Sequence, residues 1–256
     1  DNYCWPDPVE SDKTPDGAYK MAQLVRSNKA LYDLTTLYKT PAVSGKDSCK
    51  NDSTRGGKKI SIPPTLLISS IGQIDDVTKA VTMPLKNAGD VIYVIGETKD
   101  ELGASAYYRK LAEEQGAPMN YGGTLPAVDG ETALKIYAAM NQATDAGLLK
   151  SATTPGKGGL AVSLALTAIG GQLGADVDLS GLGELDAATK LFSESNSRFI
   201  VTTAPEKAAE LEALFAGLPI AKVGAVTAEK KLVVKGAVSV ELDALAKPFK
   251  ETLHGV

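Results

Sequence analysis

The chain has 256 residues, a formal net charge of -4 and 43% hydrophobic residues, so it has enough mass for one large domain or two small ones with real cores. The mildly acidic balance and an aromatic content of only 5% count against nucleic-acid binding, which needs clustered cations and stacking rings. No apolar run is long enough to span a membrane. The two cysteines, Cys4 and Cys49, fit no zinc spacing, and we expect a reducing, cytoplasmic setting.

The first part of the chain predicts one long helix and one buried strand. Residues 1–15 are rich in proline and acids, which predicts an extended or turning path. A helix is predicted from Asp16 to Leu37, because apolar residues recur there at three- and four-residue steps. Residues 44–48 are predicted to form a turn and residues 49–59 a polar loop. Leu and Ile run almost without interruption through residues 65–74, which predicts a buried strand.

From about Met83 onward the predicted helices and strands alternate, and we place a domain boundary near residue 80. Asp129 is a predicted helix N-cap, and Pro205 is a predicted first helical residue. The predicted strands are 90–96, 174–179, 198–203, 220–226 and 231–240. The predicted helices are 105–115, 131–146, 158–169, one that begins at Pro205 and one from Glu241. Short strands close together near the end predict an α+β fold with mixed α/β layers rather than a purely parallel sheet.

Two segments are candidates for binding a phosphate group. In Gly45–Ser48 small residues let backbone N–H groups approach an anion, and Lys46 adds positive charge. The alternative is an ordinary turn after a short strand. Lys157 and Gly158 precede a predicted helix whose start could bind an anion, unless the glycines serve close packing. Neither segment has the first glycine of the usual phosphate-binding loop.

Three further polar features have a structural alternative that we favour. Asp75 and Asp76 could hold Mg²⁺, but adjacent acids at a strand end point to opposite faces, which favours a solvent-facing turn. The segment Ser193–Arg198 could form a polar site wall, but we expect a solvated turn. The only histidine, His254, lies in a C-terminal tail, where we expect it to be solvated and inert. A histidine-based catalytic triad or metal site is therefore not expected.

Several segments, in this order, resemble the second half of the synthetase region of phosphoribosylformylglycinamidine synthases, the FGAM synthase or PurL family. They are Asp1–Pro8, Ser44–Ser48, Ile62–Asp76, Glu101–Ser105, Gly159–Val162, Gly174–Leu179 and Phe192–Ser195. The resemblance implies a PurM-like C-terminal domain over residues 81–256. It implies that residues 1–80 are the C-terminal part of the second PurM-like N-terminal, ATP-binding domain. The chain is thus expected to be a C-terminal fragment of the synthetase region.

The resemblance also implies an activity. The family converts formylglycinamide ribonucleotide and glutamine-derived ammonia to the amidine in purine biosynthesis, as an ATP-dependent, C–N bond-forming ligase that uses Mg²⁺. Gly45 and Lys46 match positions near ATP or its phosphates, and Ser48 matches a substrate position. Further candidates are Asp47, as a partner for Lys46 or a metal, and Lys157 with Gly158.

No catalytic residue is assigned to this chain, and its metal ligands stay unknown. The family's catalytic histidine and most of its acidic metal ligands lie in the first half of the synthetase region, and the glutaminase is a separate domain or subunit. The fragment is therefore expected to be inactive alone and to need these missing parts as partners.

The chain departs from the family pattern at four positions. Lys46 stands where small-form members often have a magnesium-binding asparagine, and a protonated lysine cannot bind the metal. Thr154 and Gly156 replace an acid and a serine, which puts an auxiliary nucleotide site in doubt. Ala104 replaces a usual glycine, and we expect its methyl group to change little.

Other interpretations of the function remain open. One is another PurM-superfamily enzyme, such as aminoimidazole ribonucleotide synthetase, selenophosphate synthetase or thiamine-phosphate kinase. Another is a non-catalytic structural half. The apolar stripe of the helix over residues 16–37 also predicts that the fragment self-associates.

Overall fold

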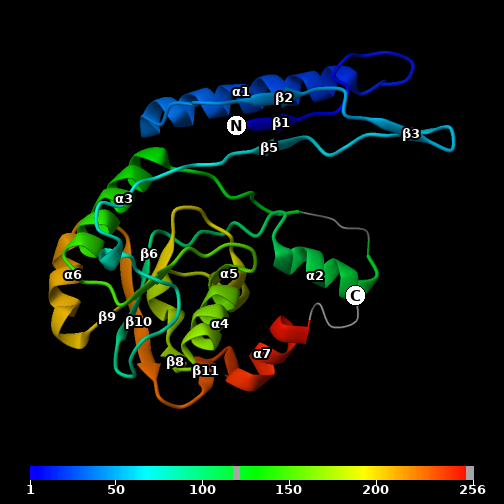
Figure 1. Cartoon of the computed structure of the whole chain (residues 1–256). Coiled ribbons are helices and arrows are strands. Elements are labelled where there is room, and N and C mark those ends of the chain that lie inside the picture. The colour runs from blue at the N-terminus through cyan, green and yellow to red at the C-terminus, as the bar shows by residue number, and fades with distance from the viewer. Residues whose placement is uncertain (118–121, 252–256) are drawn as a thin grey trace. The chain divides into compact units, whose positions relative to one another are not determined.

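A computed structural model of the chain describes residues 1–117 and 122–251, and His254 lies outside this described part. The chain divides into two compact units, Asp1–Asp75 and Asp76–Val256 (Figure 1). None of the described helices is long and apolar enough to cross a membrane. The domain identities predicted for residues 1–80 and 81–256 stay predictions.

The first unit is built on a small sheet with the strand order β2-β1-β5. Its central strand β1 (Asn2–Cys4) pairs in parallel with β2 (Lys46–Ser48) and antiparallel with β5 (Thr65–Leu67). A hairpin of β3 (Ser53–Arg55) and β4 (Lys58–Ile60) turns through two glycines, Gly56 and Gly57, at positive φ, the conformation that tight hairpin turns favour.

The long helix α1 (Gly17–Tyr38) confirms the predicted helix. It is attached to the start of the chain by the buried Trp5, whose indole N–H donates to the backbone oxygen of Lys20 at 3.0 Å. The predicted apolar stripe is only partly covered, because Met21 is 41% exposed and Val25 is 61% exposed. The prediction of self-association therefore stays open.

Three predictions in the first unit are wrong. Residues 49–59 were expected to be a polar loop, yet Ser53–Arg55 and Lys58–Ile60 pair as the β3–β4 hairpin. Residues 44–48 were expected to be a turn, yet Lys46–Ser48 form strand β2, because their backbone pairs with β1. Residues 65–74 were expected to be a buried strand, yet only Thr65–Leu67 form one, and Ile71 is 98% exposed. Among the described strands, β5 pairs only with β1, which is three residues long, so β5 ends where β1 ends. The apolar residues that follow have no described strand to pair with.

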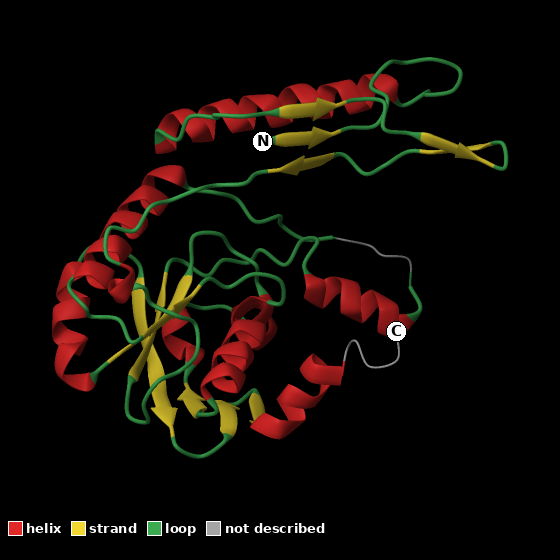
Figure 2. Cartoon of the chain, in the orientation of Figure 1, coloured by secondary structure: helices red, strands yellow, loops and turns green. Residues whose placement is uncertain are grey.

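The second unit contains a seven-stranded sheet with the order β12-β11-β8-β10-β6-β9-β7. Its strands are β6 (Val91–Ile95), β7 (Ser151–Thr153), β8 (Gly174–Val177), β9 (Phe199–Thr203), β10 (Ile220–Thr227), β11 (Lys231–Val234) and β12 (Val238–Glu241). Only the β8–β11 pair is parallel, and the other neighbours are antiparallel. This mixed arrangement of helix and sheet, visible in Figure 2, confirms the predicted fold class.

Helices cover both faces of this sheet, as Figure 1 shows. They are α2 (Ala106–Gln115), α3 (Gly130–Asp145), α4 (Gly159–Gly171), α5 (Ala187–Phe192), α6 (Ala208–Leu214) and α7 (Leu242–Glu251). Short 3₁₀ helices lie at Val77–Lys79, Leu179–Leu182 and Pro205–Lys207. Because side chains of a strand alternate between faces, Ile92 and Val94 of β6 pack in the core with α4, while Tyr93 and Ile95 pack in the core with α3 and α6.

Most predicted elements of the second unit are confirmed. Asp129 caps α3, since its carboxylate accepts the backbone N–H of Thr132 at 3.1 Å. Pro205 begins a 3₁₀ turn that precedes α6, rather than α6 itself. The single strand predicted over residues 231–240 is instead the hairpin of β11 and β12. Strand β7 and helix α5 were not predicted, because both are short and carry no strong period.

Candidate functional site

The segment Gly45–Ser48 presents polar side chains on an edge strand. Alternation along β2 places Lys46 and Ser48 on one face and Asp47 on the other. The Lys46 ammonium donates to the Ser48 hydroxyl, and the Lys46 backbone N–H donates to Asp1 O at 3.1 Å. Lys46 and Asp47 are exposed, so both remain accessible to a ligand. Cation and hydroxyl thus share one solvent-facing surface.

Three residues of the segment Ser193–Arg198 are buried, which overturns the expectation of a solvated turn. Ser193 is 0% exposed, Ser195 3% and Arg198 2%. The Arg198 guanidinium donates to Ser195 O at 3.0 Å, to Thr98 Oγ1 at 3.0 Å and to Ser193 O at 2.5 Å. Burial lowers the pKa of Arg198 to about 10, against the opposing charges of Glu101 and Glu194. The arginine is therefore a structural centre of this loop and stays protonated at neutral pH.

Two serines of this loop attach it to the segment that follows β6. Ser193 Oγ donates to Lys99 O at 2.7 Å, and Ser195 Oγ accepts the backbone N–H of Lys99 at 3.1 Å. The two hydroxyls also lie 2.9 Å apart. The Ser–x–Ser spacing is visible in the sequence, but only the fold reveals that it pairs with a backbone segment almost a hundred residues earlier.

The start of helix α4 is occupied by a carboxylate of the chain itself. Glu194 Oε1 accepts the backbone N–H of Gly158 at 2.9 Å and that of Ala106, the first residue of α2, also at 2.9 Å. Helix starts carry partial positive charge, which a carboxylate complements. Gly158 and Gly159 both have positive φ, and a Cβ on Gly159 would lie 2.5 Å from Ser193 O. Close packing therefore explains Gly159, one of the two alternatives raised for these glycines. Lys157 is exposed beside this start.

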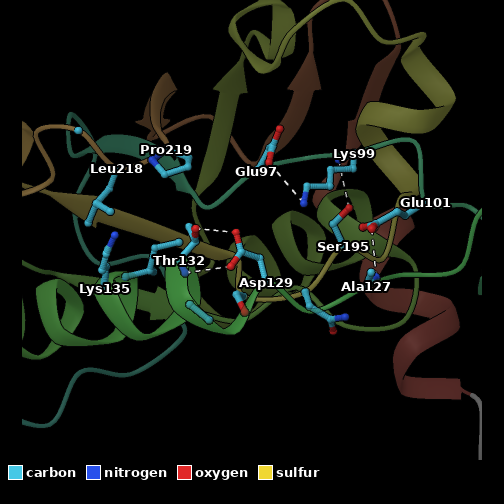
Figure 3. Close-up of a pocket in the computed structure, with 15 residues that line it drawn as sticks. Glu97, Lys99, Glu101, Ala127, Asp129, Thr132, Lys135, Ser195, Leu218 and Pro219 are labelled. Carbon is cyan, nitrogen blue, oxygen red and sulfur yellow. Dashed lines mark hydrogen bonds and ion pairs between the residues drawn. The ribbon is translucent and has the colours of Figure 1, made fainter. Parts of the chain in front are cut away.

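A pocket of about 290 Å³ lies next to this network (Figure 3). It is formed by the segment after β6, the start of α3, the loop before β9 and the loop before β10. Its charged lining residues are Glu97, Lys99, Glu101, Asp129 and Lys135. Lys99 pairs with Glu97 at 3.4 Å, an exposed contact of small energetic weight. The Thr132 side chain and N–H lower the pKa of Asp129, so Asp129 is ionised at neutral pH.

Glu101 is the buried member of this set. It is 4% exposed, and its Oε1 accepts the backbone N–H of Ala127 at 3.0 Å. Its second oxygen, Oε2, is buried without a hydrogen-bond partner in the described part of the chain. In Figure 3 the carboxylate points toward Ser195 and Ala127, among the pocket residues. The resemblance included Glu101–Ser105 as a segment, but no sequence pattern singled out Glu101.

The described residues do not form a magnesium site of their own. Residues 1–117 and 122–251 contain no group of three or more His, Cys, Asp or Glu side chains that could hold a metal ion. Asp76 accepts the N–H of Thr78 at 2.9 Å and caps the 3₁₀ helix Val77–Lys79, which agrees with the structural alternative for the Asp75–Asp76 pair. We therefore assign no chemical step to Mg²⁺ on this chain.

Comparison with known proteins gives consistent relatives. Residues 87–237 match the family "AIR synthase related protein, C-terminal domain". The phosphoribosylformylglycinamidine synthase subunit PurL of Methanocaldococcus jannaschii is 32% identical over 93% of this chain and 32% of its own length. The PurL of Deinococcus radiodurans is 31% identical over 94% of this chain and 32% of its own length. The chain thus spans about a third of the curated relatives that it matches.

A solved structure shows the same fold. Thermotoga maritima PurL complexed with FGAR superimposes with a TM-score of 0.63 at 19% identity, covering 84% of this chain and 36% of that one. Together with the curated relatives, this confirms the resemblance that the sequence motifs indicated. The chain belongs to the family of AIR synthase related proteins, C-terminal domain, and is a relative of the PurL subunits of phosphoribosylformylglycinamidine synthase.

Proposed function

We propose that this chain is part of a phosphoribosylformylglycinamidine synthase, the ATP-dependent ligase that converts formylglycinamide ribonucleotide and glutamine-derived ammonia to the amidine. The observation that carries the proposal is the 32% identity with a PurL subunit over 93% of the chain. The reaction is carried over from these relatives, and ATP, Mg²⁺ and a cytoplasmic setting are further parts of the proposal. Partners in the proposal are the first half of the synthetase region and a glutaminase domain or subunit.

The proposed contribution of this chain is one wall of the substrate and nucleotide site. Lys46 is exposed and holds its ammonium beside the Ser48 hydroxyl, a pair that can meet a phosphate with a charge and a hydrogen bond. Gly45 lies too close to Asp1 for a side chain, because a Cβ there would lie 2.6 Å from Asp1 Oδ1. Asp47 is exposed on the opposite face of β2. Following the sequence resemblance, the proposal has ATP near Gly45 and Lys46 and the ribonucleotide near Ser48.

A structural role for the start of α4 is a second candidate. The Gly158 N–H is already used by Glu194, and Thr154 and Gly156 stand where the family often has an acid and a serine. A phosphate at Lys157 and Gly158 would have to compete with that internal carboxylate. These observations favour a structural role for the start of α4 over nucleotide binding there.

Calorimetric titration with Mg-ATP and Mg-ADP distinguishes the two segments. We expect saturable binding by the chain, a loss of at least about tenfold in affinity for Lys46→Ala, equivalent to about 1.4 kcal/mol, and little change for Lys157→Ala. Lys58→Ala, an exposed lysine on β4, is the matched charge control. Loss in Lys157→Ala alone would move the phosphate to α4. If the parent chain binds no nucleotide, the chain acts as a scaffold, or its nucleotide site needs the first half of the synthetase region.

An activity assay tests the proposed division of labour. The chain alone, supplied with formylglycinamide ribonucleotide, Mg-ATP and ammonium, should release no ADP above background. Addition of the first half of a PurL synthetase region should restore turnover. Turnover by the isolated chain would overturn the proposal that the catalytic groups lie outside it.

A further inference from the structure

We propose that a pocket at the C-terminal end of α3 binds a compact phosphate group, free or carried on a small ester, through Lys86 and Lys150. The pocket lies within the second unit and is lined by residues from two segments, 78–86 and 144–150. The inference goes beyond the proposed function and does not depend on it, because no residue of Gly45–Ser48 takes part.

The first observation is the charge of the lining. Lys79, Lys86 and Lys150 line the pocket, and Asp145 is the single acid among its described lining residues. Three lysines and one aspartate give the lining a formal charge of +2, on a chain whose net charge is -4. Lys79 pairs with Asp145 at 3.3 Å. That ion pair uses the only carboxylate of the described lining, so the charges of Lys86 and Lys150 are left without a counterion.

The second observation concerns these two ammonium groups. Lys86 Nζ donates to Thr82 Oγ1 and to Pro84 O, both at 2.8 Å, and neither acceptor carries a charge. These bonds position the ammonium and leave one of its three N–H groups for a ligand. Lys150 is exposed, and its ammonium has no hydrogen bond or ion pair in residues 1–117 and 122–251. One cation is therefore held in place, and the other can turn toward an anion.

The end of α3 offers an alternative explanation, because cations also gather at the negative end of a helix. Its last carbonyls are already satisfied, since three backbone N–H groups that follow the helix donate to them at 2.9–3.0 Å. Lys207 Nζ donates to Gly147 O at 3.0 Å. The partial charge of a helix end is about half a unit, which is smaller than the excess on the lining. The helix therefore does not account for Lys86 and Lys150.

The third observation is the size of the cavity. Its volume is about 260 Å³, below the roughly 300–1,000 Å³ of typical ligand sites, which suits a compact anion better than a nucleotide. A phosphate ester carries about -1.5 to -2 charges at neutral pH, whereas a carboxylate carries one. Two lysines without counterions match the phosphate, which lysine binds as a point charge.

Amide NMR spectra of the isotope-labelled chain, recorded at constant ionic strength, test the site. The probes are inorganic phosphate and glycerol 3-phosphate, with acetate as a single-charge comparison. We expect saturable shifts of the Thr82 and Lys150 amides with both phosphates and no saturation with acetate. Glycerol 3-phosphate that binds at least threefold more tightly than phosphate would support an ester as the ligand, and equal or weaker binding would support the free anion. Shifts confined to residues 45–48, or none, would overturn the proposal.

Substitutions test the two lysines directly. Lys150→Ala removes a side chain that makes no described contact, so the fold should be kept while phosphate binds at least tenfold more weakly. Lys150→Arg keeps the charge and should stay within threefold of the parent. Lys86→Ala should also lose at least tenfold.

Two controls separate this site from general charge attraction and from the proposed nucleotide site. Lys230 is an exposed lysine between β10 and β11 whose ammonium has no partner in the described residues, and Lys230→Ala should change phosphate affinity less than twofold. Lys46→Ala should leave the Thr82 and Lys150 shifts unchanged, even if it abolishes nucleotide binding. Equal losses in Lys150→Ala and Lys230→Ala would refute a specific site at the end of α3.

Discussion

Glu194 Oε1 lies 2.9 Å from the backbone nitrogen of Gly158, and the same oxygen lies 2.9 Å from the nitrogen of Ala106. One carboxylate of the loop before β9 thereby joins the starts of α2 and α4. The loop is itself fixed by the buried Arg198. The stability of this region should therefore depend on a few residues whose side chains or backbone meet there.

Removal of the Glu194 carboxylate should loosen both helix starts. Glu194→Ala leaves two backbone N–H groups without their acceptor, and we expect a loss of about 2 kcal/mol in the free energy of unfolding. Glu194→Gln keeps an acceptor oxygen and should lose less than half as much. Urea denaturation at pH 7 measures both values. Equal stability of Glu194→Ala and the parent chain would show that solvent replaces the carboxylate without cost.

Gly159 should not tolerate a side chain. Its φ of 61° is in the left-handed region, and an added Cβ would lie 2.5 Å from Ser193 O, a backbone atom that cannot swing away. We expect Gly159→Ala to cost about 3 kcal/mol, or to prevent folding. Gly156→Ala is the matched control, because a Cβ there meets nothing within 4 Å, and its effect should stay within about 0.5 kcal/mol. Thermal and urea unfolding compare the two, and a similar cost for both would contradict the steric explanation.

Replacement of Ala104 by glycine should stabilise the folded chain. Ala104 stands where the resembled family usually has glycine, and its φ is 57°, a conformation that costs an L-residue about 1 kcal/mol or more. The structure thus gives this departure a backbone consequence that the sequence comparison did not predict. Ala104→Gly should raise the free energy of unfolding by about 0.5–1 kcal/mol. Ala138→Gly, on the exposed face of α3, should lower it by about 1 kcal/mol. Two changes of the same sign would refute the proposed strain.

Asp186 should make part of the stability depend on pH. It caps α5, accepting the Thr189 N–H at 2.9 Å and the Thr189 hydroxyl at 2.7 Å, and these bonds hold its pKa below the usual value. A depressed folded pKa gives stabilisation that is present above the unfolded pKa of about 3.9 and is lost as pH falls through the folded value.

Asp186→Ala should therefore lose about 1 kcal/mol at pH 7 and much less near pH 2. Asp186→Asn keeps a good N-cap and should lie close to the parent chain at pH 7. Urea unfolding at a series of pH values measures the difference between each variant and the parent. A difference for Asp186→Ala that is the same at both pH values would exclude the ionised cap as its source.

Local sequence signals predicted much of the second unit. Asp129 was predicted as a helix N-cap and caps α3, while Ser105, predicted as the first residue of a helix, is the N-cap of α2. The run Val91–Ile95 is apolar throughout because both of its faces meet a helical layer, so it was recognisable as a buried strand. The same reasoning failed at residues 65–74, where an equally apolar run has only one strand beside it.

The sequence by itself determined the family, the fold class and most helices and strands, because capping residues, apolar periods and ordered motifs act over short distances along the chain. The tertiary structure decided which polar residues are buried together. The sequence predicted a solvated turn at Ser193, Ser195 and Arg198. In the folded chain these residues are buried and hydrogen-bonded to Thr98 and Lys99. Burial and long-range hydrogen bonding are properties of the packed chain, so no local pattern could show that Glu194 closes the start of α4 or that Glu101 keeps an oxygen unpaired.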